Sequence, residues 1–333
     1  MAAQEDNLLR DRQAELPLVL VFRPLSLDLP MKDRFRKNYR LLDTAESSMP
    51  TPSFLAAHAQ SVKALICVGP YPITSEILRC LPSLEVIVGS SAGVNHIDMP
   101  ACRRRGISVT NAGSSFSEDV ADYAVGLLMD VLRRVSASYR YVCAGLWSLK
   151  GEYPLGSKLG GKRIGIVGLG SIGSLIAKRL EAFNCCIAYN SRKEKPCVPY
   201  PYYPNACDLA ASSDVLIVCC ALTDETRHII NRDVMIALGK GGVIVNVGRG
   251  PLVDEKELVQ FLSRGELGGA GLDVFENEPN VPNELYTLDN VVLSPHKAVL
   301  TPESFTALQE LIMGNLEAFF TNKPLLSEVK DDY

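Results

Sequence analysis

Short apolar runs alternate with amphipathic segments in the first third of the chain. The runs of strand length are Leu18–Phe22, Ala64–Val68, Glu85–Val88 and Ile107–Thr110. Helical patterns lie between them, for example at Thr74–Cys80 and Met99–Arg104. Because strands that alternate with helices pair in parallel, this pattern predicts βα units and a parallel sheet.

The pattern then changes to one long helical stretch from Ser117 to Leu146. Ser117 is a suitable N-cap, and Glu118 and Asp119 favour the positive end of the helix macrodipole. The stretch predicts a single helix that links two domains. Pro154 and several glycines in Trp147–Lys158 end the pattern.

A second βα series follows. Its strand candidates are Arg163–Val167, Cys185–Tyr189, Val215–Cys220, Val243–Val247, Gly271–Val274 and Asn290–Leu293. Helices are expected from Ile172, near Asn231 and from Asp254, and a last one from Thr301-Pro302 to about Phe320. The fold class predicted is therefore α/β, with two Rossmann-like, doubly wound parallel-sheet domains and an active-site cleft between them.

Composition narrows the function. The chain has 333 residues, 47% apolar and 22% charged, with a net charge of −4, which gives nucleic-acid binding little electrostatic support. No apolar stretch is long enough to span a membrane, and Met1–Pro17 is polar, so we expect a cytoplasmic protein. The ten cysteines include no Cys-x-x-Cys pair, and we interpret them as buried free thiols in a reducing compartment, with no disulfide or metal site.

A glycine-rich turn predicts a dinucleotide site. Gly168, Leu169, Gly170, Ser171, Ile172 and Gly173 form Gly-x-Gly-x-x-Gly between the strand Arg163–Val167 and a helix, and a second strand follows. In that context the glycines let backbone N–H groups meet a pyrophosphate at a helix N-terminus. The alternative is a tight turn without a ligand.

The end of the second strand bears on the coenzyme. An NAD site favours an acidic residue there, whereas this chain has Ser191, Arg192 and Lys193 after Tyr189-Asn190. A hydroxyl and two cations suit a 2′-phosphate, so we predict NADPH, with NADH possible but weaker. The alternative is a solvated loop and an enzyme that accepts either coenzyme.

Three residues supply candidate catalytic chemistry. Arg249 follows the run that ends at Val247, Glu278 precedes Pro279, and His296 follows Ser294-Pro295. A guanidinium that holds a carboxylate, an imidazole that moves a proton and a carboxylate that orients it are the groups needed to reduce a 2-keto acid.

Five motifs occur together, and the similarity that they indicate covers almost the whole chain. They are the Gly168–Gly173 turn, Ala221-Leu222-Thr223, Asn246-Val247-Gly248-Arg249-Gly250 with Val253-Asp254-Glu255, Leu272-Asp273-Val274-Phe275, and Ser294-Pro295-His296. This set resembles the D-isomer-specific 2-hydroxyacid dehydrogenase family, and most closely its plant-type hydroxypyruvate/glyoxylate and hydroxyphenylpyruvate reductases, which share the Asn-Ser-Arg strand end.

The resemblance implies roles for individual residues. Arg249 would bind the substrate carboxylate and carbonyl oxygen, His296 would donate a proton to the keto oxygen, and Glu278 would fix the His296 tautomer and favour its acid form. Ser91, Ala92 and Gly93 would help to hold the carboxylate. The residues implied along the coenzyme, beyond the glycine turn and the Ser191 loop, are Ala221, Thr223, Val247, Gly248, Arg249 and Asp273.

The same resemblance implies a domain plan and a function. Residues 1–116, completed by 301–333, would form a flavodoxin-like substrate-binding domain, and 117–300 an NAD(P)-binding Rossmann domain, in a homodimer. The expected activity is NADPH-preferring reduction of small 2-keto acids such as hydroxypyruvate and glyoxylate to D-2-hydroxy acids. The alternatives are 4-hydroxyphenylpyruvate reduction and, in another class, a dinucleotide-sensing protein like the family's transcriptional corepressors.

The chain departs from the family at one place. The family commonly follows its histidine with x-Gly-Ser, whereas Lys297-Ala298-Val299 follows His296 here. A hydroxyl near the substrate is lost and an alanine replaces a glycine. The change bears on substrate choice and turnover and leaves the reaction type as it is.

Overall fold

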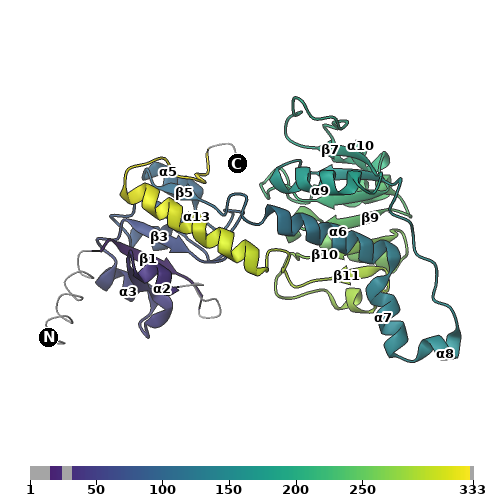
Figure 1. The fold of residues 1–333 in the computed structure, drawn as a ribbon, viewed down its shortest axis with the longest axis horizontal. Coiled ribbons are helices and arrows are strands. Elements are labelled where there is room, and N and C mark those ends of the chain that lie inside the picture. Colours follow the sequence, from purple (N-terminus) through teal and green to yellow (C-terminus); the bar gives the residue numbers. More distant parts are fainter. Residues whose placement is uncertain (1–15, 25–31, 331–333) are drawn as a thin grey trace. The chain divides into compact units, whose positions relative to one another are not determined.

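The computed structural model describes residues 16–24 and 32–330. These form two compact units: one comprises the described residues up to Phe116 and from Thr301 onward, and the other is Ser117–Leu300 (Figure 1). The polar N-terminal segment through residue 15 and the C-terminal end from Asp331 lie outside the described residues. Each unit is built on one parallel sheet, which confirms the predicted fold class of two doubly wound α/β domains.

The first unit has a five-stranded sheet in the order β2-β1-β3-β4-β5. Its strands are β1 (Leu18–Phe22), β2 (Arg40–Asp43), β3 (Ala64–Cys67), β4 (Val86–Gly89) and β5 (Ser108–Thr110). Its helices are α2 (Lys32–Arg36), α3 (Thr51–His58), α4 (Ser75–Arg79), α5 (Met99–Arg104) and α13 (Pro302–Phe320), with a 3-10 turn η1 (Thr44–Glu46). Every residue of β3 and β4 is buried, as expected for central strands of a parallel sheet covered on both faces.

The C-terminal part of the chain belongs to this first unit. Thr301 caps α13 through a capping box with Ser304, Pro302 occupies the first turn, and the helix ends at Phe320, as predicted. α13 packs against β4 (Figure 1). The segment after it returns to β5, where the N–H of Val329 donates to the carbonyl of Val109 at 2.8 Å.

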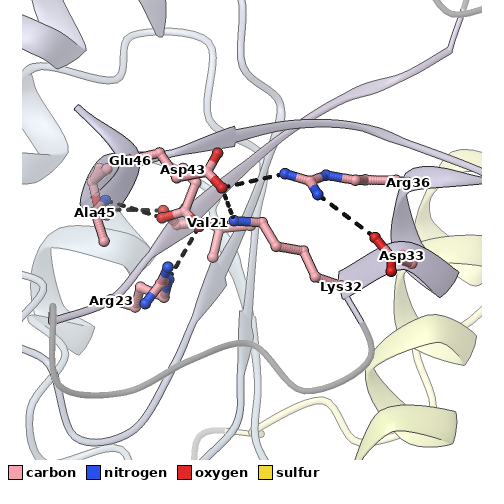
Figure 2. Close-up of polar contacts among 9 residues, drawn as sticks. Val21, Arg23, Lys32, Asp33, Arg36, Asp43, Ala45 and Glu46 are labelled. Atoms are coloured by element: carbon pink, nitrogen blue, oxygen red, sulfur yellow. Dashed lines mark hydrogen bonds and ion pairs between the residues drawn. The ribbon is translucent and has the colours of Figure 1, made fainter.

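A network of ion pairs lies at the ends of β1 and β2. The side chain of Asp43 is fully buried and binds Lys32 and Arg23, the latter at 3.1 Å, while Lys32 also binds Glu46 at 2.6 Å (Figure 2). Burial raises the pKa of Asp43, but Lys32, the N–H of Ala45 and Arg23 together hold that pKa below its usual value. The network therefore stabilises this end of the sheet.

The second unit has a six-stranded parallel sheet in the order β11-β10-β9-β8-β6-β7. Its strands are β6 (Arg163–Val167), β7 (Cys186–Asn190), β8 (Val215–Val218), β9 (Val243–Asn246), β10 (Gly269–Leu272) and β11 (Val291–Leu293). Its longer helices are α6 (Ser117–Arg133), α7 (Val135–Cys143), α9 (Ser171–Glu181) and α12 (Glu255–Ser263), and its shorter ones are α8 (Leu146–Lys150), α10 (Ala206–Ala211), α11 (Arg232–Leu238), η2 (Gly250–Leu252) and η3 (Asn283–Thr287). A parallel bridge between Tyr189 and Tyr202 continues the sheet beyond β7, which gives the strand order of a dinucleotide-binding fold.

Side-chain size along β10 explains how helices cover this sheet. An added Cβ on Gly269 would meet Val131 at 2.7 Å, and one on Gly271 would meet Leu127 at 3.1 Å, so both glycines face α6. Ala270 and Leu272 point the opposite way, as the strand period of two requires, into the core that α10, α11 and α12 cover. α6 packs beside α9 on the glycine side (Figure 1).

The predicted single helix from Ser117 to Leu146 is wrong. The chain forms α6, α7 and α8, with breaks at Arg134 and Gly145, whose φ angles are 55° and 67°. At the first break the Asp130 carboxylate accepts the N–H of Ser136 at 2.7 Å, which stabilises a new helix start instead of a continuous helix.

All ten cysteines lie within the described residues and are free, as predicted. Their burial is only partly as expected, since Cys67 and Cys102 are buried but Cys143, Cys186 and Cys197 are exposed. Burial raises the pKa of the Cys102 thiol to about 11, which keeps it protonated. Among helices of the described residues, none has the length and apolar character needed to cross a bilayer.

Candidate active site

The glycine turn between β6 and α9 has the geometry of a phosphate site. Gly168 has a φ of 103°, and a Cβ there would lie 2.6 Å from the backbone of Cys220. A Cβ on Gly173 would lie 2.2 Å from the carbonyl oxygen of Gly168. Gly170 is the N-cap of α9 and offers no side-chain cap, so the first N–H groups of the helix remain for an anion. These features fit a pyrophosphate.

The loop after β7 carries the residues predicted to meet the 2′ position of the coenzyme. The Asn190 side chain anchors its start by donating to the carbonyl of Tyr203 at 2.8 Å. Ser191 Oγ donates to the carbonyl of Lys193 at 2.6 Å, which folds the loop on itself. Arg192 and Lys193 are exposed. A hydroxyl and two cations thus lie in one short exposed turn.

The other predicted coenzyme residues follow β8 and β9. Thr223 begins a turn in which the Thr226 hydroxyl donates to the carbonyl of Ala221 at 2.8 Å. Val247 is 7% exposed, and a Cβ on Gly248 would meet Leu252 at 2.7 Å. Both loops leave the carboxyl ends of parallel strands, the side of the sheet where α/β folds bind ligands.

Arg249 is held by a turn that Asn246 organises. The Asn246 amide donates to the carbonyl of Arg249 at 3.0 Å and accepts the N–H of Gly248 at 3.1 Å. Nη1 of Arg249 donates to the carbonyl of Gly248 at 2.7 Å. Burial lowers the pKa of Arg249, and the charge of Glu278 raises it, so the guanidinium is partly desolvated and lies in the electrostatic field of that carboxylate.

Glu278 and His296 form a direct pair. Oε2 of Glu278 lies 2.7 Å from Nδ1 of His296, and each side chain is 35% exposed. Oε1 of Glu278 accepts the N–H of Phe275 at 3.1 Å, which fixes the carboxylate. Burial raises the pKa of Glu278. The opposite effect of His296, the Phe275 N–H and Arg249 is larger, so the pKa of Glu278 lies below its usual value. Glu278 is therefore ionised at neutral pH and can hold a proton on Nδ1.

A buried carboxylate, Asp273, shapes the loop that carries His296. Asp273 is 1% exposed and accepts the N–H groups of Lys297 at 2.9 Å and Ala298 at 3.0 Å, as well as the hydroxyl of Ser294. Its own carbonyl accepts the N–H of His296 at 2.8 Å. His296 has a φ of 49°, and these bonds on both sides stabilise that left-handed conformation.

The structure brings together three of the predicted site residues and leaves three others in a separate unit. Arg249, Glu278 and His296 lie in the second unit, where Glu278 binds His296 directly and interacts electrostatically with Arg249. Ser91, Ala92 and Gly93 follow β4 in the first unit. There the carbonyl of Ser91 accepts the N–H of Ala112 at 2.9 Å, and that of Ala92 accepts the Asn111 side chain at 3.0 Å.

Comparison with known proteins identifies the family. A family model described as the NAD-binding domain of D-isomer-specific 2-hydroxyacid dehydrogenases matches residues 125–298. A glyoxylate/hydroxypyruvate reductase of Arabidopsis thaliana is 56% identical over 320 residues, which cover 96% of this chain and 99% of that protein. The chain belongs to the D-isomer-specific 2-hydroxyacid dehydrogenase family. A hydroxyphenylpyruvate reductase of Plectranthus scutellarioides is 48% identical over 276 residues, 83% of this chain and 88% of that one.

Solved structures of the family agree with the fold. The crystal structure of an NADPH-dependent glyoxylate/hydroxypyruvate reductase from Sinorhizobium meliloti, in complex with NADP and malonate, is 35% identical. It superposes with a TM-score of 0.87 and covers 94% of this chain and 96% of its own. The resemblance stated from the motifs is thereby confirmed.

In this 2-hydroxyacid dehydrogenase, no sequence pattern indicated the residues that hold the candidate catalytic groups. Tyr123 on α6 donates to Ser294 Oγ at 2.8 Å, and Ser294 in turn binds Asp273. Asn246 is part of the motif Asn246-Val247-Gly248-Arg249-Gly250, but no role for its side chain was evident from the sequence. No local pattern marks Tyr123, because its partner is 171 positions away, whereas Asn246 could have been suspected from its place directly after an apolar strand.

Proposed function

We propose that this protein reduces small 2-keto acids, with hydroxypyruvate and glyoxylate as first candidates, to D-2-hydroxy acids, and that it prefers NADPH. The observation that carries the proposal is the Glu278 carboxylate, which binds the His296 imidazole at 2.7 Å and interacts electrostatically with the Arg249 guanidinium. The reductase names of the relatives support it.

Each group has a chemical role. Arg249 binds the substrate carboxylate, because a planar guanidinium offers two parallel donors. The ionised Glu278 keeps a proton on Nδ1 of His296, so that Nε2 of the imidazolium faces the substrate as donor. His296 then delivers its proton to the keto oxygen, where negative charge develops. The nicotinamide coenzyme, when bound, supplies the hydride.

The coenzyme is assigned to residues of the second unit. The Gly168–Gly173 turn and the start of α9 would hold the pyrophosphate, and Ala221, Thr223, Val247 and Gly248 would line the coenzyme. A carboxylate has about four acceptor positions, and the Asp273 carboxylate uses three of them within the chain. With 1% exposure, Asp273 would act on the nicotinamide side of the site by holding the loop that carries His296.

NADPH preference is proposed from the loop after β7. Ser191, Arg192 and Lys193 present a hydroxyl and two cations, and no carboxylate precedes Glu194. The Sinorhizobium relative is described as NADPH-dependent. On this proposal, residues 117–300 are the coenzyme-binding domain, and residues 1–116 with 301–333 are the substrate-binding domain, where Ser91, Ala92 and Gly93 help to hold the carboxylate.

A panel of 2-keto acids, assayed with NADPH and NADH, tests the function. Hydroxypyruvate and glyoxylate should be turned over, faster with NADPH, and the product should be the D-isomer on chiral chromatography. The His296→Gln variant controls for contaminating reductases. If the wild type reduces no 2-keto acid while it binds NADPH tightly, the enzymatic proposal fails and a dinucleotide-sensing, corepressor-like role takes its place.

The same panel decides a second candidate. The Plectranthus relative acts, by its name, on hydroxyphenylpyruvate, and Val299 makes the region after His296 more apolar than the family's serine would. A higher kcat/KM for 4-hydroxyphenylpyruvate than for hydroxypyruvate would favour that aromatic substrate. The reverse order supports our first choice.

We also propose a cytoplasmic homodimer. Several large apolar side chains of the segment from α7 to residue 155 are more than half exposed: Val135, Tyr139, Val142, Trp147, Leu149 and Leu155. Such a surface is typical of a subunit contact. Analytical ultracentrifugation should give a dimer for the wild type and a monomer for the Trp147→Ser, Leu149→Ser double variant. Ten free thiols suit a reducing compartment, which imaging of a tagged chain would test.

A further inference from the structure

The segment that carries Glu278 packs closely against the loop that carries Arg249. A Cβ added to Gly250 would lie 1.9 Å from the carbonyl carbon of Phe275 and 2.4 Å from the nitrogen of Glu276. Only a glycine fits there, so the backbone beside Arg249 touches the peptide that leads to Glu278. The placement of Glu278 therefore depends on what fastens residues 275–278 to this loop.

Glu255 makes one of the hydrogen bonds that hold residues 275–278 in place, and it binds their main chain directly. It is the first residue of α12, and its Oε2 accepts the N–H of Glu276 at 3.1 Å. Burial raises the pKa of Glu255, the Glu276 N–H lowers it, and the charges of Glu276 and Glu278 raise it again. Glu255 thus lies within the field of both carboxylates, and it is bonded to the residue two positions before the catalytic one.

A second interaction that holds this segment joins the side chains of His228 and Glu276. Nε2 of His228 lies 2.6 Å from Oε1 of Glu276, and the N–H of His228 donates to the carbonyl of Pro251 at 2.8 Å. Nδ1 of His228 is also 3.8 Å from Asp254. The Glu255 and His228 interactions connect Glu276 to residues 251–255, which follow Arg249 immediately. The Arg249 loop and the Glu278 segment are therefore held as one piece.

We propose that Glu255 is a positioning residue that fixes the Glu278 segment against the Arg249 loop, so that Glu278 meets His296 in the geometry needed for proton transfer. This inference rests on the proposed function. Glu255 touches no reacting atom and acts through the N–H of Glu276. What it supplies is an acceptor oxygen, which a glutamine also has.

Three variants separate this role from a general effect on the helix. Glu255→Ala removes the acceptor, Glu255→Gln keeps an acceptor without the charge, and Glu257→Ala removes another acidic residue of the same helical turn, one that binds Arg232 at 3.0 Å. A shift of a catalytic group by about 1 Å can cost about a hundredfold in rate. We expect kcat for hydroxypyruvate to fall about tenfold in Glu255→Ala, equivalent to about 1.4 kcal/mol. Glu255→Gln and Glu257→Ala should stay within about threefold of wild type, with KM for NADPH unchanged in all three.

Hydrogen–deuterium exchange of residues 273–280 gives a readout that needs no activity. The Glu276 amide should exchange faster in Glu255→Ala and at the wild-type rate in Glu255→Gln and Glu257→Ala. Equal exchange in all variants overturns the proposal, as does full turnover in Glu255→Ala or an equal loss in Glu255→Gln. If the wild type reduces no keto acid, the proposed function fails, and the exchange result alone decides whether Glu255 holds the segment.

Discussion

Replacing Ser191 by Asp and Arg192 by Ala should reverse the NADPH preference that we propose for this enzyme. The new carboxylate would repel a 2′-phosphate and accept a hydrogen bond from the ribose hydroxyl of NADH. The Arg192 change removes a cation from the short turn after β7, which ends at Asn190. No residue that binds the pyrophosphate is altered.

The structure limits the size of the effect. A charge-assisted hydrogen bond contributes about 1.5–3 kcal/mol, but Arg192 is exposed, and exposed ion pairs are worth about 1 kcal/mol or less. Ser191 Oγ already donates to Lys193 at 2.6 Å, so it would exchange one bond for another on binding phosphate. We therefore expect Arg192→Ala alone to weaken NADPH binding about fivefold, which corresponds to about 1 kcal/mol. The double variant should change the NADPH-to-NADH affinity ratio about a hundredfold, because repulsion by the new carboxylate adds to the loss.

Titration of both coenzymes, followed by their fluorescence, measures this ratio at one fixed ionic strength. Lys195→Ala serves as the control, because it removes an exposed cation from the same loop outside the proposed clamp. Raising the salt concentration should shrink the wild-type preference, since the Debye length falls from about 10 Å at 0.1 M to about 3 Å at 1 M. A wild type that binds both coenzymes equally, or a ratio unmoved in the double variant, would refute a phosphate clamp at these residues.

Three further variants test the site and the fold. His296→Gln should lower kcat by about a hundredfold to ten-thousandfold, the usual worth of a general acid, with the coenzyme Kd unchanged in calorimetry; near-full turnover would exclude His296 as the donor. Arg249→Lys should reduce kcat/KM for the keto acid severely although the charge survives, and a mild loss would place Arg249 away from the substrate. Asp43→Asn should lower the free energy of unfolding by about 2–3 kcal/mol at pH 7, because it removes the buried negative charge that Lys32 and Arg23 bind. The folded pKa of Asp43 lies below its unfolded value of about 3.9, so the stability difference between wild type and variant is full above about pH 3.9 and should disappear as the pH falls through the folded pKa. Urea titrations at several pH values measure it. A stability difference that persists in acid would contradict the role of Asp43 as an ionised, paired carboxylate.

Most of the strands could be predicted because their buried residues form short apolar runs, whereas β10, with the sequence Gly-Ala-Gly-Leu, was predicted two residues too late, at Gly271–Val274. The predicted bounds of β1 and β6 are those of the structure, and β4 and β7 are shifted by one residue. β2 was not predicted, because this edge strand has the sequence Arg-Leu-Leu-Asp, with only its last residue buried. Four residues with a charge at each end give no periodic signal.

The break after α6 escaped prediction for a different reason. Apolar residues continue at helical spacing through Val135, Tyr139 and Val142, so the pattern reads as one helix. These side chains are 57%, 70% and 54% exposed. Their helical spacing therefore forms an apolar surface and does not mark a buried helix face. Arg134, which turns the chain, has no intrinsic preference for a left-handed conformation, and only the fold accounts for it.

The proposed catalytic residues stand out in the sequence because their chemistry requires particular side chains, whereas the residues that hold them act largely through main-chain groups. Asp273 binds the N–H groups of residues 297 and 298, which any amino acid except proline supplies. The departure from x-Gly-Ser after His296 therefore leaves the anchoring of the loop intact, and Ala298 is accommodated at 3% exposure. What changes is the surface that the loop offers: Lys297 places its ammonium 6.0 Å from the centre of the Tyr123 ring, and Val299 stands where a hydroxyl is usual. Substrate choice can thus change at these positions without loss of the proton transfer proposed for His296, because the two properties depend on different atoms of the same loop.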